Sequence, residues 1–523
     1  MMKITIKILV LYAFLQIMCS DAKPASLNLS LHRRMDPISL KHIFHVKSYE
    51  EVPEYEIVHI RELPKSSDEE TKILHLSAFG KDIHLHLRRS EDFDERLKTT
   101  KLFTAESSKN GIRFAEVFVE DNDSGTTYQD INLMAAVSVH QGVNGELQMV
   151  SLFTLISVLM LSVSFNDIWE NQQLVNDNHR DKRRAVLDKV WPEVLLLVDY
   201  DTYTEHISYN LTETQIRRYY SAFLNGVDLR FKAFTDPQIS LILAGIIISK
   251  DKNAAPYLEN NKLSSPDDYA FNGEKALKDL SHYLYSAKGL PEYDLALLLT
   301  ELDMCMEKEN ECVRHTAGLA YYRGACFVRE SLGRVMKIGI VEDKGGFDGI
   351  IGATHEIGHL LGSLHDGDSQ LDALSGPGAE SCGFEEGFLM SYAENTETMF
   401  QWSECSLEQI KYFLNTEEAS CLRNEPDNKN LLGGELPGTM LSLDEQCERN
   451  WATRACANDS RVCLQLHCYY DDGECVPLLP AAEGSVCGDS QICKDGRCVK
   501  NHVINNTILT EGPICNDNST DMY

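Results

Sequence analysis

Short apolar runs alternate with longer amphipathic segments between residues 190 and 300. Residues 194–198, 239–249 and 295–299 are largely apolar, as is typical of strands that are buried on both faces. Residues 212–227 and 276–285 instead place apolar side chains three or four positions apart, which is the spacing of one face of an α-helix. Strands that alternate with helices predict an α/β layer in this part of the chain.

The chain begins with a basic segment followed by an apolar one. Two lysines precede an apolar run over residues 8–18, and the small residues Ser20 and Ala22 follow at positions typical of a cleavage site. The pattern predicts a secretory signal peptide over residues 1–22, with a buried helix as the alternative.

A second apolar segment covers residues 149–165 and carries no charge. Its length is at the lower limit of the roughly 17–25 residues that a membrane-spanning helix needs. We interpret the segment as a buried strand pair or helix, and a membrane span that exists before processing is the alternative that the sequence leaves open.

Composition limits the class of protein. A length of 523 residues allows about three domains, and a hydrophobic content of 43% is sufficient for real cores. The formal net charge of −31 argues against nucleic acid or an anionic membrane surface as a partner.

The cysteines lie almost entirely in the C-terminal half. After Cys19, which would leave with the signal peptide, the next cysteine is Cys305 and the last is Cys515. Such a distribution predicts a disulfide-rich region in an oxidising compartment. Six glycosylation sequons are compatible with a secreted glycoprotein. They are at Asn28, Asn122, Asn210, Asn458, Asn505 and Asn518.

The most specific motif is His-Glu-Ile-Gly-His-Leu-Leu-Gly-Ser-Leu-His-Asp at residues 355–366. His355 and His359 are four positions apart, so on a helix they project from one face and can hold one zinc ion. Gly362 allows the chain to turn and bring His365 in as the third ligand, which leaves the fourth zinc position open. An amphipathic helix with surface histidines is the alternative.

This motif resembles the zinc signature of the metzincin peptidases, HExxHxxGxxH. Asp366 directly after the third histidine is similar to the adamalysin or reprolysin branch, which includes ADAM and ADAMTS proteases. The resemblance implies an α/β catalytic domain with a mixed five-stranded sheet, a zinc helix and a downstream methionine turn. Met390 is the candidate for that turn, and ordinary core packing is its alternative.

The resemblance also implies the roles of the residues around the zinc. Glu356 would act as the general base on a zinc-bound water, and Asp366 would orient the local backbone or a neighbouring group. Tyr392 is interpreted as a pocket wall, with assistance to an oxyanion as the alternative role. A structural calcium site is implied at Glu193, Asp294, Cys421 and Asn424.

The cysteine pattern after residue 300 divides into two groups. Six cysteines in the catalytic region allow fifteen pairings, and the resemblance implies Cys305–Cys312, Cys326–Cys421 and Cys382–Cys405. A further eight cysteines between residues 447 and 498 are similar to the disintegrin-like cysteine-rich domain of ADAMTS enzymes. Cys515 is left over, and is free or pairs between chains.

A basic cluster precedes the first strand of the α/β pattern. Arg180, Lys182, Arg183 and Arg184 resemble a furin-type processing site, with a solvated basic loop as the alternative. Residues 23–184 contain no cysteine, which excludes latency through a propeptide cysteine on zinc. Processing after Arg184 would leave the mature enzyme without a stable membrane anchor.

Five segments result from these observations. They are a signal peptide (1–22), a prodomain (23–184), a reprolysin-like zinc peptidase domain (185–425), a disintegrin-like cysteine-rich domain (436–500) and a C-terminal tail (501–523). The prediction is a secreted zinc endopeptidase, made as a zymogen, that acts on extracellular proteins and is similar to arthropod salivary or venom metalloproteases. The alternatives are a binding protein that acts through its cysteine-rich domain, and an endogenous matrix-remodelling protease.

Overall fold

The computed structural model describes two parts of the chain. In the N-terminal part these are residues 6–9, 57–62, 71–78, 81–89, 100–109, 111–117, 126–130, 135–141 and 147–153. From residue 188 to residue 501 all residues are described except 210, 264–268, 309–310, 315–316, 371–374, 392–395, 426–435, 471–472 and 489–490.

A seven-stranded mixed sheet forms the centre of the α/β layer. Its order is β18 (Gly318–Ala320), β21 (Ile338–Glu342), β15 (Leu295–Thr300), β11 (Glu193–Val198), β13 (Ile242–Ser249), β5 (Leu102–Ser108) and β6 (Gly111–Glu116). The five strands from β21 to β5 are parallel, whereas the edge strands β18 and β6 run antiparallel to their neighbours.

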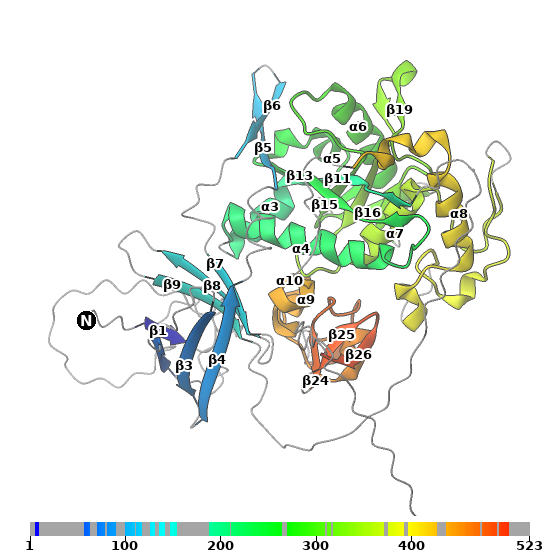
Figure 1. The fold of residues 1–523 in the computed structure, drawn as a ribbon. Helices are drawn as coiled ribbons and strands as arrows, with labels where there is room; N and C mark the ends of the chain where they lie inside the picture. Colours follow the sequence, from blue (N-terminus) through cyan, green and yellow to red (C-terminus); the bar gives the residue numbers. More distant parts are fainter. Residues whose placement is uncertain are drawn as a thin grey trace, which may run out of the picture.

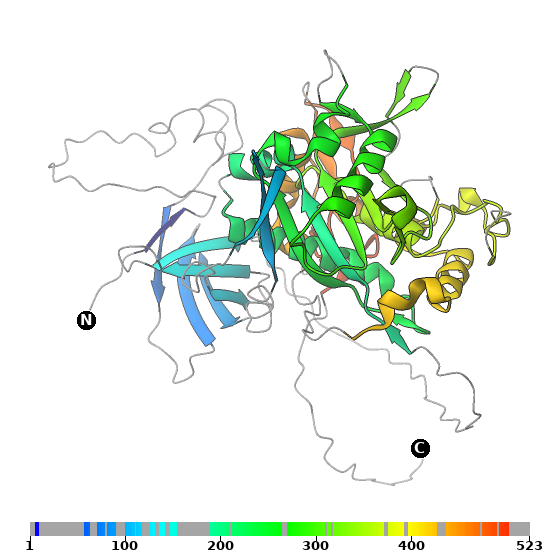
Figure 2. The ribbon, with the colours of Figure 1, turned by 90° about the horizontal axis from the view of Figure 1, so that it is seen from above.

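The sequence predicts five strands in this sheet, and the structure has seven. The five expected strands come from residues 193–342, and β5 and β6 are added from residues that the sequence assigns to the prodomain. The addition occurs at β13, which would otherwise be an edge strand with unpaired backbone groups. Both figures show the β5–β6 hairpin, in blue, along this edge of the sheet (Figures 1 and 2).

Helices cover both faces of the sheet (Figure 1). One core lies between the sheet and the helices α4 and α7, and a second lies between the sheet and α5 and α6. Leu196 and Val198 of β11 belong to the first core, whereas Leu195 and Leu197 belong to the second. Burial on both faces explains why this strand is apolar without interruption.

The α-helices described in this region are α3 (Tyr200–Ser208), α4 (Glu213–Phe231), α5 (Pro256–Glu259), α6 (Gly273–Ser286), α7 (Ile350–Leu360) and α8 (Glu404–Leu414). The sequence predicts α4, α6 and α7 and does not predict the other three. Thr212 forms a capping box with Gln215 at the start of α4, which satisfies backbone donors that the helix itself leaves free. Predicted helices 212–227 and 276–285 therefore correspond to α4 and α6.

Shorter elements connect the larger ones. The short strands are β10 (Lys189–Val190), β12 (Gln238–Ile239), β14 (Ala270–Asn272), β16 (Asp303–Lys308), β17 (Glu311–Val313), β19 (Val328–Arg329) and β20 (Arg334–Val335). The 3-10 helices are η2 (Lys252–Ala254), η3 (Glu330–Leu332), η4 (Phe384–Glu386), η5 (Glu397–Phe400) and η6 (Glu417–Arg423).

The remaining N-terminal strands form a separate antiparallel sheet. Its order is β1 (Ile6–Leu9), β2 (Ile57–Glu62), β3 (Thr71–Ala78), β4 (Lys81–Arg89), β7 (Thr126–Asp130), β8 (Ala135–Gln141) and β9 (Leu147–Phe153). The first five residues of the apolar segment 149–165 lie in β9, and the others lie outside the described residues. Within the described ranges, no helix combines the length and the apolar character that a membrane crossing requires.

The C-terminal module is small and rich in disulfides. Its elements are α9 (Pro437–Met440), α10 (Leu443–Trp451), η7 (Ser460–Cys463), β22 (His467–Tyr469), β23 (Cys475–Pro477), β24 (Val486–Gly488), β25 (Gln491–Lys494) and β26 (Arg497–Lys500). Its disulfides are Cys447–Cys468, Cys456–Cys475, Cys463–Cys493 and Cys487–Cys498. Five of these cysteines belong to the buried cluster of the module, so the disulfides take much of the place of an apolar core.

Candidate metal centre

The zinc motif folds as a helix followed by a sharp turn. Helix α7 ends at Leu360, and Gly362 has a φ of +97°, which is in the left-handed region. A Cβ at this position would lie 2.9 Å from Cβ of Phe413, so a side chain is excluded by contact as well as by conformation. The turn carries the chain back to His365, beside the histidines of the helix.

Three imidazoles converge at the end of this turn. Nε2 of His365 lies 3.2 Å from Nε2 of His355 and 3.1 Å from Nε2 of His359. Ligands at 2.0–2.1 Å from a tetrahedral zinc ion are about 3.3 Å apart, so the three nitrogens have the spacing that zinc needs. These three histidines could therefore hold the metal that the sequence predicts.

Backbone carbonyls fix the orientation of two of the rings. Nδ1 of His355 lies 2.8 Å from the carbonyl oxygen of Leu389, and Nδ1 of His359 lies 2.8 Å from that of Ser363. A proton on each Nδ1 satisfies these contacts and leaves the Nε2 lone pair free for a metal. Burial lowers the pKa of His355 to about 4 and holds the pKa of His359 well below its usual value, so both rings are neutral at pH 7.

Glu356 is buried beside the three histidines, next to the edge strand β18. Its side chain is 4% exposed, and burial raises its pKa to about 8. Oε2 has no hydrogen-bond partner among the described residues. A Cβ at Gly318 would lie 2.4 Å from Oε1, so the absence of a side chain at residue 318 makes room for the carboxyl group. This carboxyl group can accept or hold a proton beside the converging imidazoles.

Met390 lies against the zinc helix. It is fully buried, and its sulfur would be 2.9 Å from a Cβ at Gly358, one residue before His359. Its neighbour Leu389 provides the carbonyl that orients His355. The segment around Met390 therefore packs against helix α7 and orients one of the candidate ligands.

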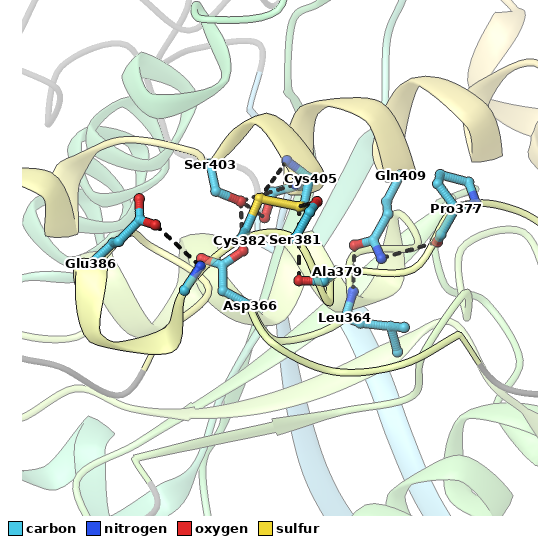
Figure 3. Close-up of a disulfide and its surroundings, with 12 residues drawn as sticks. Leu364, Asp366, Pro377, Ala379, Ser381, Cys382, Glu386, Ser403, Cys405 and Gln409 are labelled. Atoms are coloured by element: carbon cyan, nitrogen blue, oxygen red, sulfur yellow. Dashed lines mark hydrogen bonds between the residues drawn. A yellow bond between two sulfur atoms is a disulfide. The ribbon is translucent and has the colours of Figure 1, made fainter.

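Asp366 directly follows the third histidine and is hydrogen-bonded to two other segments, of which Figure 3 labels the one at Ser403. Its Oδ1 accepts a hydrogen bond from Ser403 at 2.5 Å, and its Oδ2 accepts one from Ser391 at 3.2 Å. Ser403 caps the start of α8, and its neighbourhood is held by the disulfide Cys382–Cys405. The orienting role expected for Asp366 is consistent with these contacts.

Gln409 is a residue of the site that the sequence does not single out. Its Oε1 accepts the backbone N–H of Leu364 at 3.0 Å, and its Nε2 donates to the carbonyl of Pro377 at 3.1 Å (Figure 3). It is buried and holds the segment that leads into His365. Its position as a polar residue on the inner face of an amphipathic helix is the only sequence signal that could have identified it.

A second unpredicted group links the site to the C-terminal module. Trp402 lies against Gly358 of the zinc helix, and its Nε1 donates to the carbonyl of Arg230 at 3.0 Å. The Arg230 side chain is buried and forms ion pairs with Glu483 and Asp495 of the module. Side chains that lie more than 150 positions apart meet here, which no local pattern could predict.

The residues of the expected calcium site lie close together, at the start of β11. The carboxylate of Asp294 accepts the N–H of Glu193 at 3.0 Å, and Asn424 donates to the Glu193 carboxylate at 3.1 Å. Cys421 is joined to Cys326, whose N–H donates to the Asp294 carbonyl at 3.1 Å. Burial, followed by the charge of Glu193, raises the pKa of Asp294 to about 7.

The structure pairs the six cysteines of the catalytic region as the resemblance implies. The disulfides are Cys305–Cys312, Cys326–Cys421 and Cys382–Cys405. Cys463, Cys487 and Cys498 also lie close together, but each is already part of a disulfide and none offers a free thiolate to a metal.

Several predicted residues lie outside the described parts of the chain. They are Tyr392, the basic cluster Arg180–Arg184, Cys515 and the sequons at Asn28, Asn122, Asn210, Asn505 and Asn518. The remaining sequon residue, Asn458, is described and exposed, which is compatible with glycosylation.

Two family models match the chain. Residues 217–366, which include all three histidines, match the reprolysin-like metallo-peptidase family M12B. Residues 437–499 match the ADAMTS cysteine-rich domain 2. The chain contains a reprolysin-like M12B domain and an ADAMTS cysteine-rich domain.

Curated relatives agree with this assignment. The protein named "A disintegrin and metalloproteinase with thrombospondin motifs like" of Bombyx mori is 46% identical over 327 residues, which are 62% of this chain and 46% of the insect protein. "A disintegrin and metalloproteinase with thrombospondin motifs 16" of Mus musculus is 28% identical over 59% of this chain and 23% of its own length.

The reprolysin-like chain thus spans less than half the length of these relatives. The M12B match and the names of these relatives are those of metallopeptidases, which agrees with a metal at the three histidines.

Proposed function

We propose that this chain is a secreted zinc endopeptidase that is made as a zymogen and hydrolyses extracellular proteins. The observation that carries the proposal is the convergence of three imidazole Nε2 atoms, 3.1 and 3.2 Å from one another, beside the buried carboxyl group of Glu356. His355, His359 and His365 would hold the zinc through these atoms.

When bound, zinc supplies a Lewis acid that polarises a peptide carbonyl and lowers the pKa of water. The protein itself handles the proton. Glu356 takes a proton from the attacking water at its unpartnered Oε2 and passes it to the leaving amine. Burial raises the pKa of Glu356, so its carboxylate is a stronger base than that of an exposed glutamate.

The edge strand β18 offers a place for an extended substrate. It is the last strand of the sheet on this side and is antiparallel to β21, so one row of its backbone groups is not paired within the sheet. A peptide that adds to this edge would be held by main-chain hydrogen bonds next to Glu356. Protein substrates in extended conformation are therefore the class we propose.

We further propose the supporting roles of the surrounding residues. Met390 forms the methionine turn beneath the zinc helix, Asp366 positions the turn that carries His365, and Tyr392 forms part of the pocket wall. Glu193, Asp294, Asn424 and the Cys421 carbonyl bind calcium. In support, two carboxylates and an amide already share hydrogen bonds there. The ammonium group of Lys337 also interacts with these carboxylates, so calcium has to compete with it for them.

The proposed life history follows the segments of the sequence. The signal peptide is removed at about residue 22, the basic cluster is cut after Arg184, and the enzyme of residues 185–500 acts outside the cell. Seven disulfides among the described residues favour an oxidising compartment. The similarity to arthropod salivary or venom proteases suggests a glandular setting, with endogenous matrix remodelling as the alternative.

Hydrolysis of an unfolded generic protein by material processed after Arg184 tests the proposal. A zinc chelator should abolish cleavage, and added zinc should restore it. His359→Ala should lose both the metal and the activity, whereas His282→Ala, at an exposed histidine of α6, should keep both. A protein that stays inert with zinc bound after complete cleavage at Arg184 would contradict the proposal and favour the binding protein.

A further inference from the structure

The edge of the sheet opposite the metal site is covered by a hairpin from the N-terminal region. β5 and β6 form this hairpin, which we define as residues 100–117, and it precedes the predicted cleavage cluster at 180–184. All other strands of the sheet come from residues after 188. Cleavage at the cluster would therefore divide the chain between β5 and its neighbour β13.

Strand β5 of the hairpin is paired with β13 over its first four residues. The carbonyl of Lys101 accepts the N–H of Ile246 at 2.9 Å, and the carbonyl of Ala105 accepts the N–H of Lys250 at 2.9 Å. Between these two bonds the strands pair in parallel, from Leu102 with Ile246 to Ala105 with Ser249. Parallel pairing of this kind is normally found inside a sheet rather than at a loosely attached edge.

Side chains of the hairpin complete both hydrophobic cores. Leu102 is 1% exposed and belongs to the core beneath α4 and α7, whereas Phe103 is 7% exposed and belongs to the core beneath α5 and α6. Loss of the hairpin would expose both cores at once at the edge of β13. Such a surface is stable in water only when it remains covered.

Two polar contacts fix the hairpin from outside the strand ladder. The guanidinium of Arg217, on α4, donates to the carbonyl of Thr100 at 3.1 Å. The carboxylate of Asp251 accepts the N–H of Ser107 at 2.8 Å. These contacts lie towards opposite ends of β5, so the strand is held at both ends as well as by its pairing with β13.

We infer that the hairpin of residues 100–117 stays bound after processing and is a permanent, non-covalent part of the mature enzyme. The inference rests on the proposed cleavage after Arg184. Residues 23–184 contain no cysteine, so no disulfide can retain them and the strand pairing must do so. Processing would then cut the chain without removing this strand from the fold.

A retained hairpin is compatible with an open active site. Five strand spacings of about 4.8 Å separate β18, beside Glu356, from β5, which amounts to about 24 Å across the sheet. The hairpin can thus remain in place without reaching the zinc. Its role is to complete the sheet and not to block the site.

The test uses the full chain with Glu356→Gln, so that its own peptidase activity has no influence. A protease specific for paired basic residues cuts it after Arg184, and the product is analysed by size exclusion and native mass spectrometry. We expect the N-terminal fragment to co-elute with the enzyme in a one-to-one ratio and to separate only in denaturant. Separation in native buffer would overturn the inference.

Two substitutions in the hairpin provide a matched comparison. Phe103→Asp places a charge in a core, whereas Arg113→Asp places the same side chain at a position that is 70% exposed. After cleavage, Phe103→Asp should release the fragment and abolish hydrogen-exchange protection of the Ile246 and Lys250 amides, which donate to the hairpin, and Arg113→Asp should do neither. Equal retention in both variants would contradict the proposed docking.

The outcome is independent of whether the chain is a peptidase. A protein that retains the fragment but hydrolyses no substrate would refute the proposed activity and leave the docked hairpin standing. An active enzyme from which the fragment separates in native buffer would refute the docked hairpin and leave the proposed activity standing.

Discussion

The ion pair between Arg230 and Glu483 joins the catalytic region to the C-terminal module, and its two acidic partners allow a controlled test. The side chains of Arg230 and Glu483 are 2% and 7% exposed, whereas that of Asp495 is 52% exposed. The guanidinium also lies over the ring of Phe400, 5.1 Å from its centroid, next to the segment that supports the zinc helix through Trp402.

Glu483→Gln and Asp495→Asn each replace a carboxylate by an amide of the same shape. The first leaves a buried arginine without its buried counter-charge, which costs about 3 kcal/mol. The second removes an exposed partner, for which about 0–1 kcal/mol is typical. At about 2–4 °C per kcal/mol for a domain of this size, we expect Glu483→Gln to lower the Tm by roughly 6–12 °C.

Thermal unfolding followed by tryptophan fluorescence, in a Glu356→Gln background that prevents self-cleavage, measures both effects. Asp495→Asn should shift the Tm by no more than about 4 °C. An equal loss in both variants, or a larger one in Asp495→Asn, would refute the assignment of the stabilising pair to the buried carboxylate.

Three further predictions concern single residues. Gly362→Ala should cost at least about 1–2 kcal/mol because of its φ of +97°, and metal analysis after dialysis should show reduced zinc, since His365 is displaced. Burial raises the pKa of Asp199 to about 6 in the folded state, so the stability that its protonated form contributes is lost as the pH rises from about 4 to 6. Denaturant titrations of Asp199→Asn should therefore show a free energy of unfolding whose change over this pH range is smaller by up to about 3 kcal/mol. Calcium should raise the Tm of the wild type but not that of Glu193→Gln, and an equal rise in both would refute the proposed ligand set.

The parts of the site that the sequence predicts are local. The three histidines and Glu356 lie within eleven residues, and their spacing together with Gly362 determines a helix and a turn that bring the imidazoles together. Strands such as β11 were also predictable, because a strand buried on both faces has to be apolar throughout.

The parts that the sequence does not predict depend on distant contacts. Polar and apolar residues alternate too little along β5 for its sequence to predict which strand it pairs with. Its partner β13 lies more than 140 residues away and would otherwise be an edge strand. Gln409, Trp402 and Arg230 likewise act through neighbours from other segments, so their residue types alone gave no reason to select them.

Replacement of Glu356 by Gln tests the central claim most directly, with zinc content and kcat/KM measured on the same purified protein. Gln keeps the volume of the side chain but cannot take up the proton. We predict an unchanged zinc content and a loss of roughly a thousandfold in kcat/KM, whereas Glu408→Gln, at an exposed glutamate of α8, should retain full activity. Substantial hydrolysis by Glu356→Gln with zinc bound would contradict the account.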